Sequence, residues 1–189
     1  MKQISTGMWL PDGDQFFVSK LDYEKYNFNL AMFYCKKQRT AIDIGAHVGF
    51  WTQQLAGCFE SVIAIEPVLD HFNCLTLNTE KLDNVTVLHA AASDSYGILH
   101  MDVAKENSGT SKIGTTGEAV ASVMVDCLNL ANIDFIKIDV NGFEENVLNG
   151  SPQVLLRDKP VIFIEILNSH ASSSNVFGFL ESIGYECLA

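Results

Sequence analysis

The sequence has no paired cysteines and no long apolar run, and each absence excludes a class of protein. Its five cysteines are scattered without any C-x-x-C spacing, so we expect neither a zinc knuckle nor a disulfide framework. No apolar segment approaches the roughly 20 residues that a membrane helix needs, and residues 1–7 lack the apolar stretch of a signal peptide. We therefore expect a soluble protein without a membrane span, located in the cytoplasm.

Basic residues are also scarce, since 12 Lys and Arg stand against 23 Asp and Glu, for a net charge of −11. Proteins that bind nucleic acid normally present clustered Lys and Arg. The one basic cluster, Lys36, Lys37 and Arg39, is better explained as a helix end, where cations complement the helix dipole. This composition disfavours a nucleic-acid substrate and favours a small neutral or cationic one. The histidines show no spacing typical of metal ligands, so no metal is expected.

Short apolar segments alternate with helical ones along most of the chain, which predicts a parallel sheet covered by helices on both faces. The fold class is thus α/β, a doubly wound, mostly parallel sheet in one compact domain. We expect an N-terminal hairpin and helix cap in residues 1–39 and a core in 40–189. In the core we expect strands at 40–44, 61–65, 85–89, 135–140, 160–166 and 185–188 and helices at 50–56, 69–82, 144–149 and 175–183. We also expect partly β segments at 97–103 and 121–125 and a mobile surface loop at 105–117. The cap helix should cover 21–37. Strand 160–166 is apolar enough to predict a place in the middle of the sheet, and the final antiparallel edge strand is expected to be missing.

Ligands of such sheets bind beyond the carboxyl ends of the strands. The first core strand runs into a glycine loop, residues 43–49, with the pattern D-x-G-x-x-x-G. A dinucleotide site would need a glycine at position 47, where the His47 side chain would fill the space of a pyrophosphate. The loop therefore fits a ligand with a ribose but no phosphate. Glu66 ends the second core strand, where its carboxylate can accept hydrogen bonds from a ribose diol.

Four segments together resemble the FkbM-type family of class I S-adenosylmethionine-dependent methyltransferases. They are the loop D-I-G-A-H-V-G from Asp43, I-E-P from Ile65, A-A-S-D from Ala91 and F-I-K-I-D-V-N-G-F-E from Phe135. The resemblance covers roughly residues 40–166. It implies S-adenosylmethionine as the cofactor and a hydroxyl of a sugar, polyketide or similar metabolite as the acceptor. It also implies the following cofactor-binding residues, to which we add the rest of the loop and Asp139: Asp43, Gly45, Ala46, His47, Gly49, Glu66, Ser93, Asp94 and Asp139.

A hydroxyl acceptor needs its proton removed, and four titratable residues follow the later core strands: Asp139, Glu144, Glu165 and His170. We take Asp139, Glu144 and His170 as the catalytic candidates. Capping of a turn is the alternative role for Asp139, and the favourable interaction with a helix N-terminus is the alternative for Glu144. His170 could equally be an ordinary loop histidine. The family usually has glutamate where this chain has Asn141, and an amide cannot act as a base.

The sequence thus predicts an O-methyltransferase that acts on a small metabolite, sugar or glycan. The alternative is a module that binds S-adenosylmethionine, is catalytically silent and supports a partner protein. A third and weaker alternative is an enzyme that uses NAD or another nucleotide.

Overall fold

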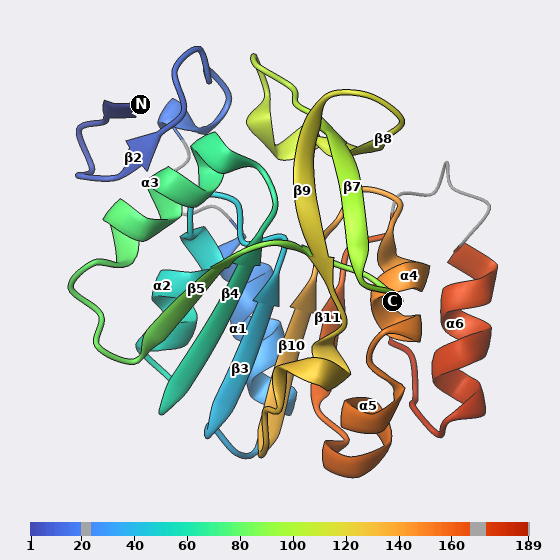
Figure 1. Ribbon diagram of the computed structural model, residues 1–189. Helices are drawn as coiled ribbons and strands as arrows, with labels where there is room; N and C mark the ends of the chain where they lie inside the picture. The colour runs from blue at the N-terminus through green and yellow to red at the C-terminus, as the bar shows by residue number, and fades with distance from the viewer. Residues whose placement is uncertain (20–23, 167–172, 189) are drawn as a thin grey trace.

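The centre of the molecule is a five-stranded parallel sheet (Figure 1). The computed structural model describes residues 1–19, 24–166 and 173–188. The strand order is β11-β10-β3-β4-β5, and the register pairs neighbouring strands in parallel throughout. The strands are β3 (Thr40–Ile44), β4 (Ser61–Glu66), β5 (Val85–His89), β10 (Ile133–Ile138) and β11 (Val161–Ile164). From β3 the chain adds β4 and β5 on one side and then β10 and β11 on the other. The strand order therefore reverses between β3 and β10, and such folds bind ligands at this switch point.

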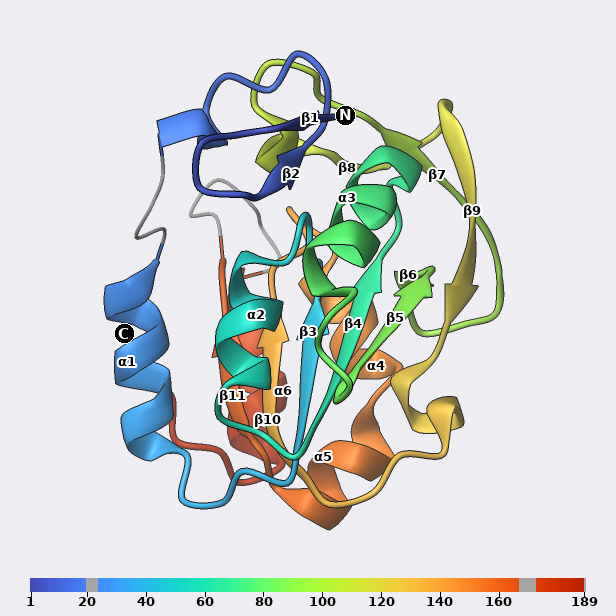
Figure 2. The ribbon, with the colours of Figure 1, turned by 90° about the vertical axis from the view of Figure 1, so that its left-hand side faces the viewer.

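Helices cover both faces of this sheet because successive strand residues are apolar on both sides. On β3, Ala41 packs with Phe28 and Trp51 in one cluster, whereas Ile42 packs with Val147 and other residues in a second cluster. The first face is covered by α1 (Lys25–Tyr34), α2 (Phe50–Ala56) and α3 (Leu69–Thr79), which lie together in Figure 2. The opposite face is covered by α4 (Glu144–Asn149), α5 (Pro152–Asp158) and α6 (Ser173–Ser182). No helix in the described ranges is both long enough and apolar enough to cross a membrane.

A second, four-stranded sheet stands beside the first in the order β6-β9-β7-β8. Its strands are β6 (Ala91–Ala92), β7 (Gly97–Asp102), β8 (Lys112–Gly114) and β9 (Glu118–Val123). Ala91, Met101 and Val120 of this sheet pack with Val68, which follows β4 and joins the sheet to the core. The segment between β7 and β9 and the hairpin of β1 (Lys2–Gln3) and β2 (Trp9–Leu10) both lie over the carboxyl ends of the central strands (Figure 2).

The structure corrects several expectations drawn from the pattern. Strand β11 lies at the edge of the sheet, not in its middle, so its apolar side chains are covered by helices on the two faces alone. Residues 185–188 form no strand, because the Tyr185 N–H bonds the Leu180 carbonyl at the end of α6. Segment 105–117 is not a free surface loop. It contains a short 3-10 turn, η2 (Ser108–Thr110), and strand β8, which pairs with β7.

Helix boundaries were also predicted imperfectly. The cap helix begins at Lys25, and part of the range expected for it lies outside the described residues. Helix α5 lies where the sequence predicted no helix, and it begins at Pro152 because proline is well suited to the first turn of a helix. The hairpin, the parallel core and its two helical layers are as the sequence predicted.

The lack of a side chain at Gly45 allows the ends of β3 and β10 to approach closely. Gly45 has φ 75°, and a Cβ added there would collide with the Asp139 carbonyl. We expect Gly45→Ala to destabilise the protein by at least about 1–3 kcal/mol, the usual cost of a strained left-handed residue. Gly178→Ala is the matched control, because a Cβ there meets nothing within 4 Å inside a helix and should stabilise by about 0.5–1 kcal/mol. Urea denaturation measures both, and equal effects of the two changes would contradict the account.

Candidate active site

A pocket opens at the carboxyl ends of the parallel strands, with an empty volume of about 910 Å³ that includes the solvent-open space at its mouth. Residues that follow all five central strands line it: Gly45, Ala46 and His47 after β3, Glu66, Pro67 and Val68 at the end of β4, Ala90, Ala91 and Ala92 after β5, Asp139, Val140 and Asn141 after β10, and Glu165 after β11. The pocket therefore lies where the topology places a ligand.

The glycine loop is fastened to the neighbouring strand through its backbone. The N–H groups of Gly45 and Ala46 donate to the Ile65 carbonyl at 3.0 and 3.1 Å, and the His47 N–H donates to Glu66 Oε2 at 2.8 Å. His47 has φ 52°, a left-handed conformation usual for glycine. The loop thus keeps the backbone path of a glycine-rich turn although a histidine stands in it.

The His47 ring is held by a hydrogen bond and is not available as a catalytic base. Its Nε2 lies 2.6 Å from Ser108 Oγ, and Ser108 Oγ donates to Asp14 Oδ2. Because Ser108 already uses its proton toward Asp14, it accepts from His47, which assigns the Nε2–H tautomer. Burial, followed by the nearby His71 and Lys137, holds the pKa of His47 well below its ordinary value. His47 is therefore neutral at physiological pH and serves as a hydrogen-bond donor.

Glu66 retains acceptor capacity although both of its oxygens are already bonded. The residue is 4% exposed, with Oε2 bonded to His47 N–H and Oε1 to Val68 N–H at 2.9 Å. His71 Nδ1 lies 3.3 Å from Oε1. Each carboxylate oxygen can accept two hydrogen bonds, so Oε2, which has one donor, can still receive a hydroxyl donor from a ligand. Next to it, Val68 and the alanines after β5 form an apolar wall together with Met101 and Ile113 from the second sheet.

These features fit the parts of an adenosylated ligand. The apolar wall suits a purine, the Glu66 carboxylate suits a ribose diol, and the tight loop at Gly45 and Ala46 leaves space for a slender chain. His47 leaves no equivalent space for a pyrophosphate, since its ring is held by Ser108. The donor set therefore agrees with S-adenosylmethionine better than with a dinucleotide.

A buried ammonium joins the glycine loop to the end of β10. Lys137 Nζ donates to the Gly45 carbonyl at 3.0 Å and lies 3.5 Å from Asp43 Oδ1 and 3.3 Å from Asp139 Oδ2. Burial opposes its charge, but Asp139 and Asp43 outweigh burial and raise the pKa of Lys137 above its ordinary value. Burial also raises the pKa of Asp43, against the effects of Lys137 and of the Thr52 hydroxyl, which donates to Oδ2 at 2.6 Å. This cluster fixes the position of Asp139 at the pocket wall.

Glu165 stands at the pocket wall with an unusual protonation behaviour. It is about half-buried, and burial together with the carboxylates of Asp139 and Glu24 raises its pKa to about 7, although Lys137 opposes the rise. Glu24, which precedes the first residue of α1, accepts a hydrogen bond from the Trp51 indole. A carboxylate that exchanges its proton near neutral pH is the property expected of a general base.

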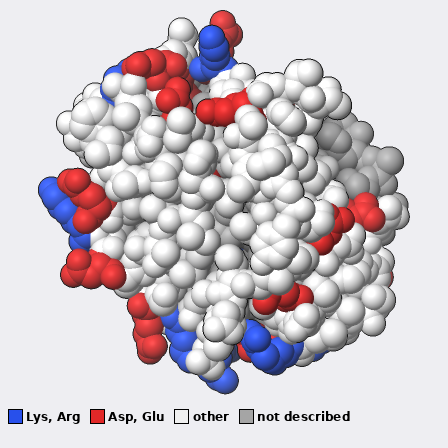
Figure 3. Space-filling model, in the orientation of Figure 1, with Lys and Arg blue, Asp and Glu red and all other residues white. Residues whose placement is uncertain are grey.

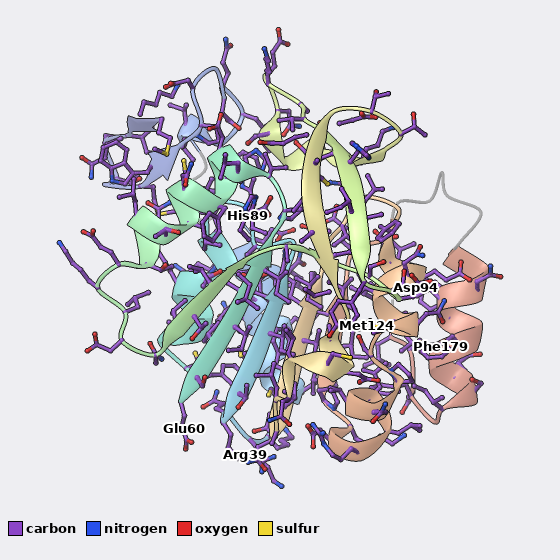
Figure 4. The ribbon with its side chains drawn as sticks, in the orientation of Figure 1. Arg39, Glu60, His89, Asp94, Met124 and Phe179 are labelled. Atoms are coloured by element: carbon purple, nitrogen blue, oxygen red, sulfur yellow. The ribbon has the colours of Figure 1, made fainter. Side chains whose placement is uncertain are left out.

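The structure brings together some of the predicted site residues and separates others. Gly45, Ala46, His47, Glu66 and Asp139 line the pocket, while Asp43, in β3, and Gly49, at the end of the loop, are buried and do not line it. Ser93 and Asp94 do not line the pocket. Asp94 lies beside α4, with Oδ2 3.3 Å from Asn146 Nδ2 (Figure 4), and Ser93 passes close to Gly150.

The remaining catalytic candidates also differ in place. Glu144 is 1% exposed and accepts the Gly142 N–H at 2.8 Å, so it stabilises the turn after β10. His170 lies outside the described residues. No group of potential metal ligands gathers in the parts of the chain that the structure describes.

The sequence did not predict the contributions of the cap and the second sheet to the pocket. Phe17 and Glu24 come from the N-terminal cap, and Met101, Ser108 and Ser111 come from the insertion after β5. These segments lack a recognisable motif. Polar residues flanked by apolar ones could have indicated a buried polar site, but the residues that they contact lie far away in the chain.

Known proteins support the same architecture. The family model "Methyltransferase FkbM domain" matches residues 43–187. The chain is similar to a solved FkbM methyltransferase from Methylobacillus flagellatus KT, with 18% identity and a TM-score of 0.61 over 93% of this chain and 42% of that one. It is also similar to a precorrin-6y C5,15-methyltransferase from Geobacter metallireducens GS-15, with 15% identity and a TM-score of 0.56 over 95% and 81% of the two chains.

At these identities the likeness to solved structures shows the fold alone. The chain spans about two fifths of the length of the Methylobacillus protein, of which it covers 42%. No curated protein matches the chain.

Removal of the buried ammonium should be costly. We expect Lys137→Met to destabilise the protein by about 3–5 kcal/mol, because it leaves the buried Asp43 carboxylate without its counter-charge. The exposed Lys81→Met is the control and should change stability by less than about 0.5 kcal/mol. Guanidinium denaturation at pH 7 measures the two, and a Lys137→Met protein as stable as the control would show that the ion cluster does not hold the site.

Proposed function

Since the chain belongs to the FkbM methyltransferase family, we propose that it transfers a methyl group from S-adenosylmethionine to a hydroxyl of a small metabolite, sugar or glycan. The family agrees with the predicted enzyme class, an S-adenosylmethionine-dependent methyltransferase, and with its cofactor. The hydroxyl acceptor and the roles of individual residues are the proposal.

The residues that would hold the cofactor come from three strand ends. Gly45 and Ala46 would contact its amino-acid part, Glu66 its ribose, and the wall of Val68 and Met101 its adenine. When bound, the cofactor supplies a methyl group that already carries its leaving group. The protein's task is then to align the acceptor and remove its proton, and alignment of this kind can contribute up to roughly 7–11 kcal/mol.

The raised pKa of Glu165 is the observation that carries the proposal. The carboxylate lies at the same pocket as the glycine loop. Its pKa of about 7 is close to physiological pH, so much of the group is unprotonated and can accept a proton. We assign Glu165 as the general base that takes the hydroxyl proton. Asp139 is held by Lys137 and orients the reacting groups.

The charge of the pocket favours a neutral or cationic acceptor. The described residues that line it include the carboxylates of Glu24, Glu66, Asp139 and Glu165 and one cation, Lys137, whose charge is already matched by Asp43 and Asp139. A phosphate or carboxylate on the acceptor would meet like charges.

The surface agrees with a partner other than nucleic acid. On the face shown in Figure 3, the described Lys and Arg side chains lie in separate groups at the top, the left and the lower edge and form no continuous patch. We therefore propose that the acceptor is not a nucleic acid. A cytoplasmic location is proposed separately, as expected from the sequence.

The second candidate is a catalytically silent module that binds the cofactor. Asn141 favours it, because the amide at this position of the family motif cannot accept a proton and is bonded to two backbone carbonyls. The two candidates differ in one assay. Incubation with labelled S-adenosylmethionine and a panel of amino sugars, neutral sugars and amino alcohols should transfer label to an alkali-stable ether, whereas the silent module would bind the cofactor and label nothing.

Glu66→Gln should weaken cofactor binding. The change keeps the size of the side chain but removes the charge that would strengthen hydrogen bonds to the ribose, so we expect the Kd for S-adenosylhomocysteine to rise about 10- to 100-fold. Isothermal titration calorimetry measures it against Glu60→Gln, which lies at the opposite end of the sheet (Figure 4). An unchanged Kd would place the ribose elsewhere.

Glu165 should set the lower limit of the pH range of activity. We expect kcat/KM to fall below about pH 7 as Glu165 is protonated, and Glu165→Gln to remove this dependence and lower the rate by roughly 10²–10⁴-fold. Glu60→Gln should keep the wild-type profile. A profile that is identical in wild type and Glu165→Gln would exclude Glu165 as the base.

The same residue gives a test that needs no substrate. Its folded-state pKa of about 7 exceeds the ordinary 4.5, so the unfolded chain releases the proton first. The wild type should therefore lose stability relative to Glu165→Gln as the pH rises from about 4.5 to 7, as measured by urea denaturation. A constant difference over this range would contradict the raised pKa.

A further inference from the structure

A short turn from the second sheet forms one wall of the pocket. This turn, η2 (Ser108–Thr110) followed by Ser111, places Ser108, Gly109 and Ser111 in the pocket lining. Ser108 and Ser111 are buried, at 1% and 9% exposed, although they belong to the Ser- and Gly-rich segment between β7 and β9. The turn is therefore a built part of the site.

Asn141 holds this turn from the end of β10. Its Nδ2 donates to the carbonyls of Gly109 at 2.8 Å and Ser111 at 2.9 Å. The residue has φ 51°, which asparagine tolerates better than most residues. A carboxylate at this position could not donate to either carbonyl. The amide thus performs a task that an ionised carboxylate at this position could not perform.

A second set of bonds holds the same turn from the other side of the pocket. Ser108 accepts from His47 of the glycine loop and donates to the buried Asp14 of the N-terminal cap, which also accepts the Ser108 N–H at 3.2 Å. Gly109 packs on the ring of Phe17, which a Cβ on the glycine would approach to 3.0 Å. The turn therefore connects the cap, the glycine loop and the end of β10.

We propose that Asn141 is a positioning residue that fixes the turn 108–111 against the cofactor pocket. The inference rests on the proposed function, because the pocket is taken to be the site of S-adenosylmethionine. The turn is ordered before the cofactor arrives, so that binding does not have to order it. Asn141 then contributes to cofactor affinity and not to proton transfer, and the loss of a base at this position does not make the protein silent.

Asn141→Asp separates this role from backbone effects. Aspartate has the same size and also tolerates φ > 0, but its carboxylate faces two carbonyl oxygens without a proton to donate. Asn129→Asp is the matched control, because Asn129 is exposed, has φ 52° and does not line the pocket. Ser108→Ala is a second variant, which removes the hydroxyl's bonds to His47 and Asp14 while keeping a small buried side chain and the backbone bond to Asp14.

Two measurements test the proposal at pH 7.5. In the ligand-free proteins, amide hydrogen exchange of residues 108–113 should become at least about tenfold faster in Asn141→Asp and Ser108→Ala than in wild type or Asn129→Asp. By calorimetry, the Kd for S-adenosylhomocysteine should rise about 10- to 100-fold in Asn141→Asp, while kcat at saturating cofactor changes less than about threefold.

The outcomes distinguish this inference from the proposed function. Wild-type exchange rates at 108–113 in Asn141→Asp, or an unchanged Kd beside a wild type that binds, would overturn the role of Asn141 alone. A wild type that does not bind S-adenosylhomocysteine would overturn the proposed function and with it the effect on affinity, whereas the exchange measurement would still decide whether Asn141 fixes the turn. If Asn141→Asp does not fold, Ser108→Ala decides: wild-type exchange and affinity there would contradict the ordered turn.

Discussion

The buried ammonium of Lys137 is the interaction on which the site depends. It lies between two carboxylates, Asp43 and Asp139, and also binds the Gly45 carbonyl, so it connects the glycine loop of β3 to the end of β10. The carboxyl ends of these neighbouring strands carry the groups that a cofactor and its acceptor would meet. A buried ion cluster of this kind sets geometry more than it adds stability. The same charges also raise or lower the proton affinity of the surrounding carboxylates, including that of Glu165.

Local sequence predicted the core because each of its elements is specified by its own residues. The apolar runs at Thr40–Ile44 and Val85–His89 became strands with the expected bounds, and the loop between Gly45 and Gly49 turned where glycines allow positive φ. Strand order was less accessible. The place of β11 at the sheet edge follows from packing of whole layers. A strand at an edge that helices cover on both faces has the same apolar sequence pattern as a strand in the middle of the sheet. The family and the fold class were confirmed, as was the predicted cofactor at the level of the family.

The remaining part of the site could not be predicted because it depends on contacts between distant segments. Asp14, Ser108 and His47 form one hydrogen-bonded chain, yet they belong to the cap, the insertion and the glycine loop. The raised pKa of Glu165 likewise depends on burial and on Asp139 and Glu24, which come from other elements. Asp94 shows the opposite case: its motif suggested a role near the adenine, whereas the structure places it beside α4. Its role in binding stays a prediction.

The central claim is that one pocket, bounded by the glycine loop and Glu66, receives the cofactor. Titration of unlabelled S-adenosylhomocysteine into ¹⁵N-labelled protein tests it most directly, since each backbone amide reports its own surroundings. The account predicts saturable shifts concentrated at the amides of Ala46, His47, Val68 and Ala91, with little change at Asp126 and Val154 on the far side of the core. Shifts confined to other surfaces, or a spectrum unchanged at millimolar ligand, would contradict it.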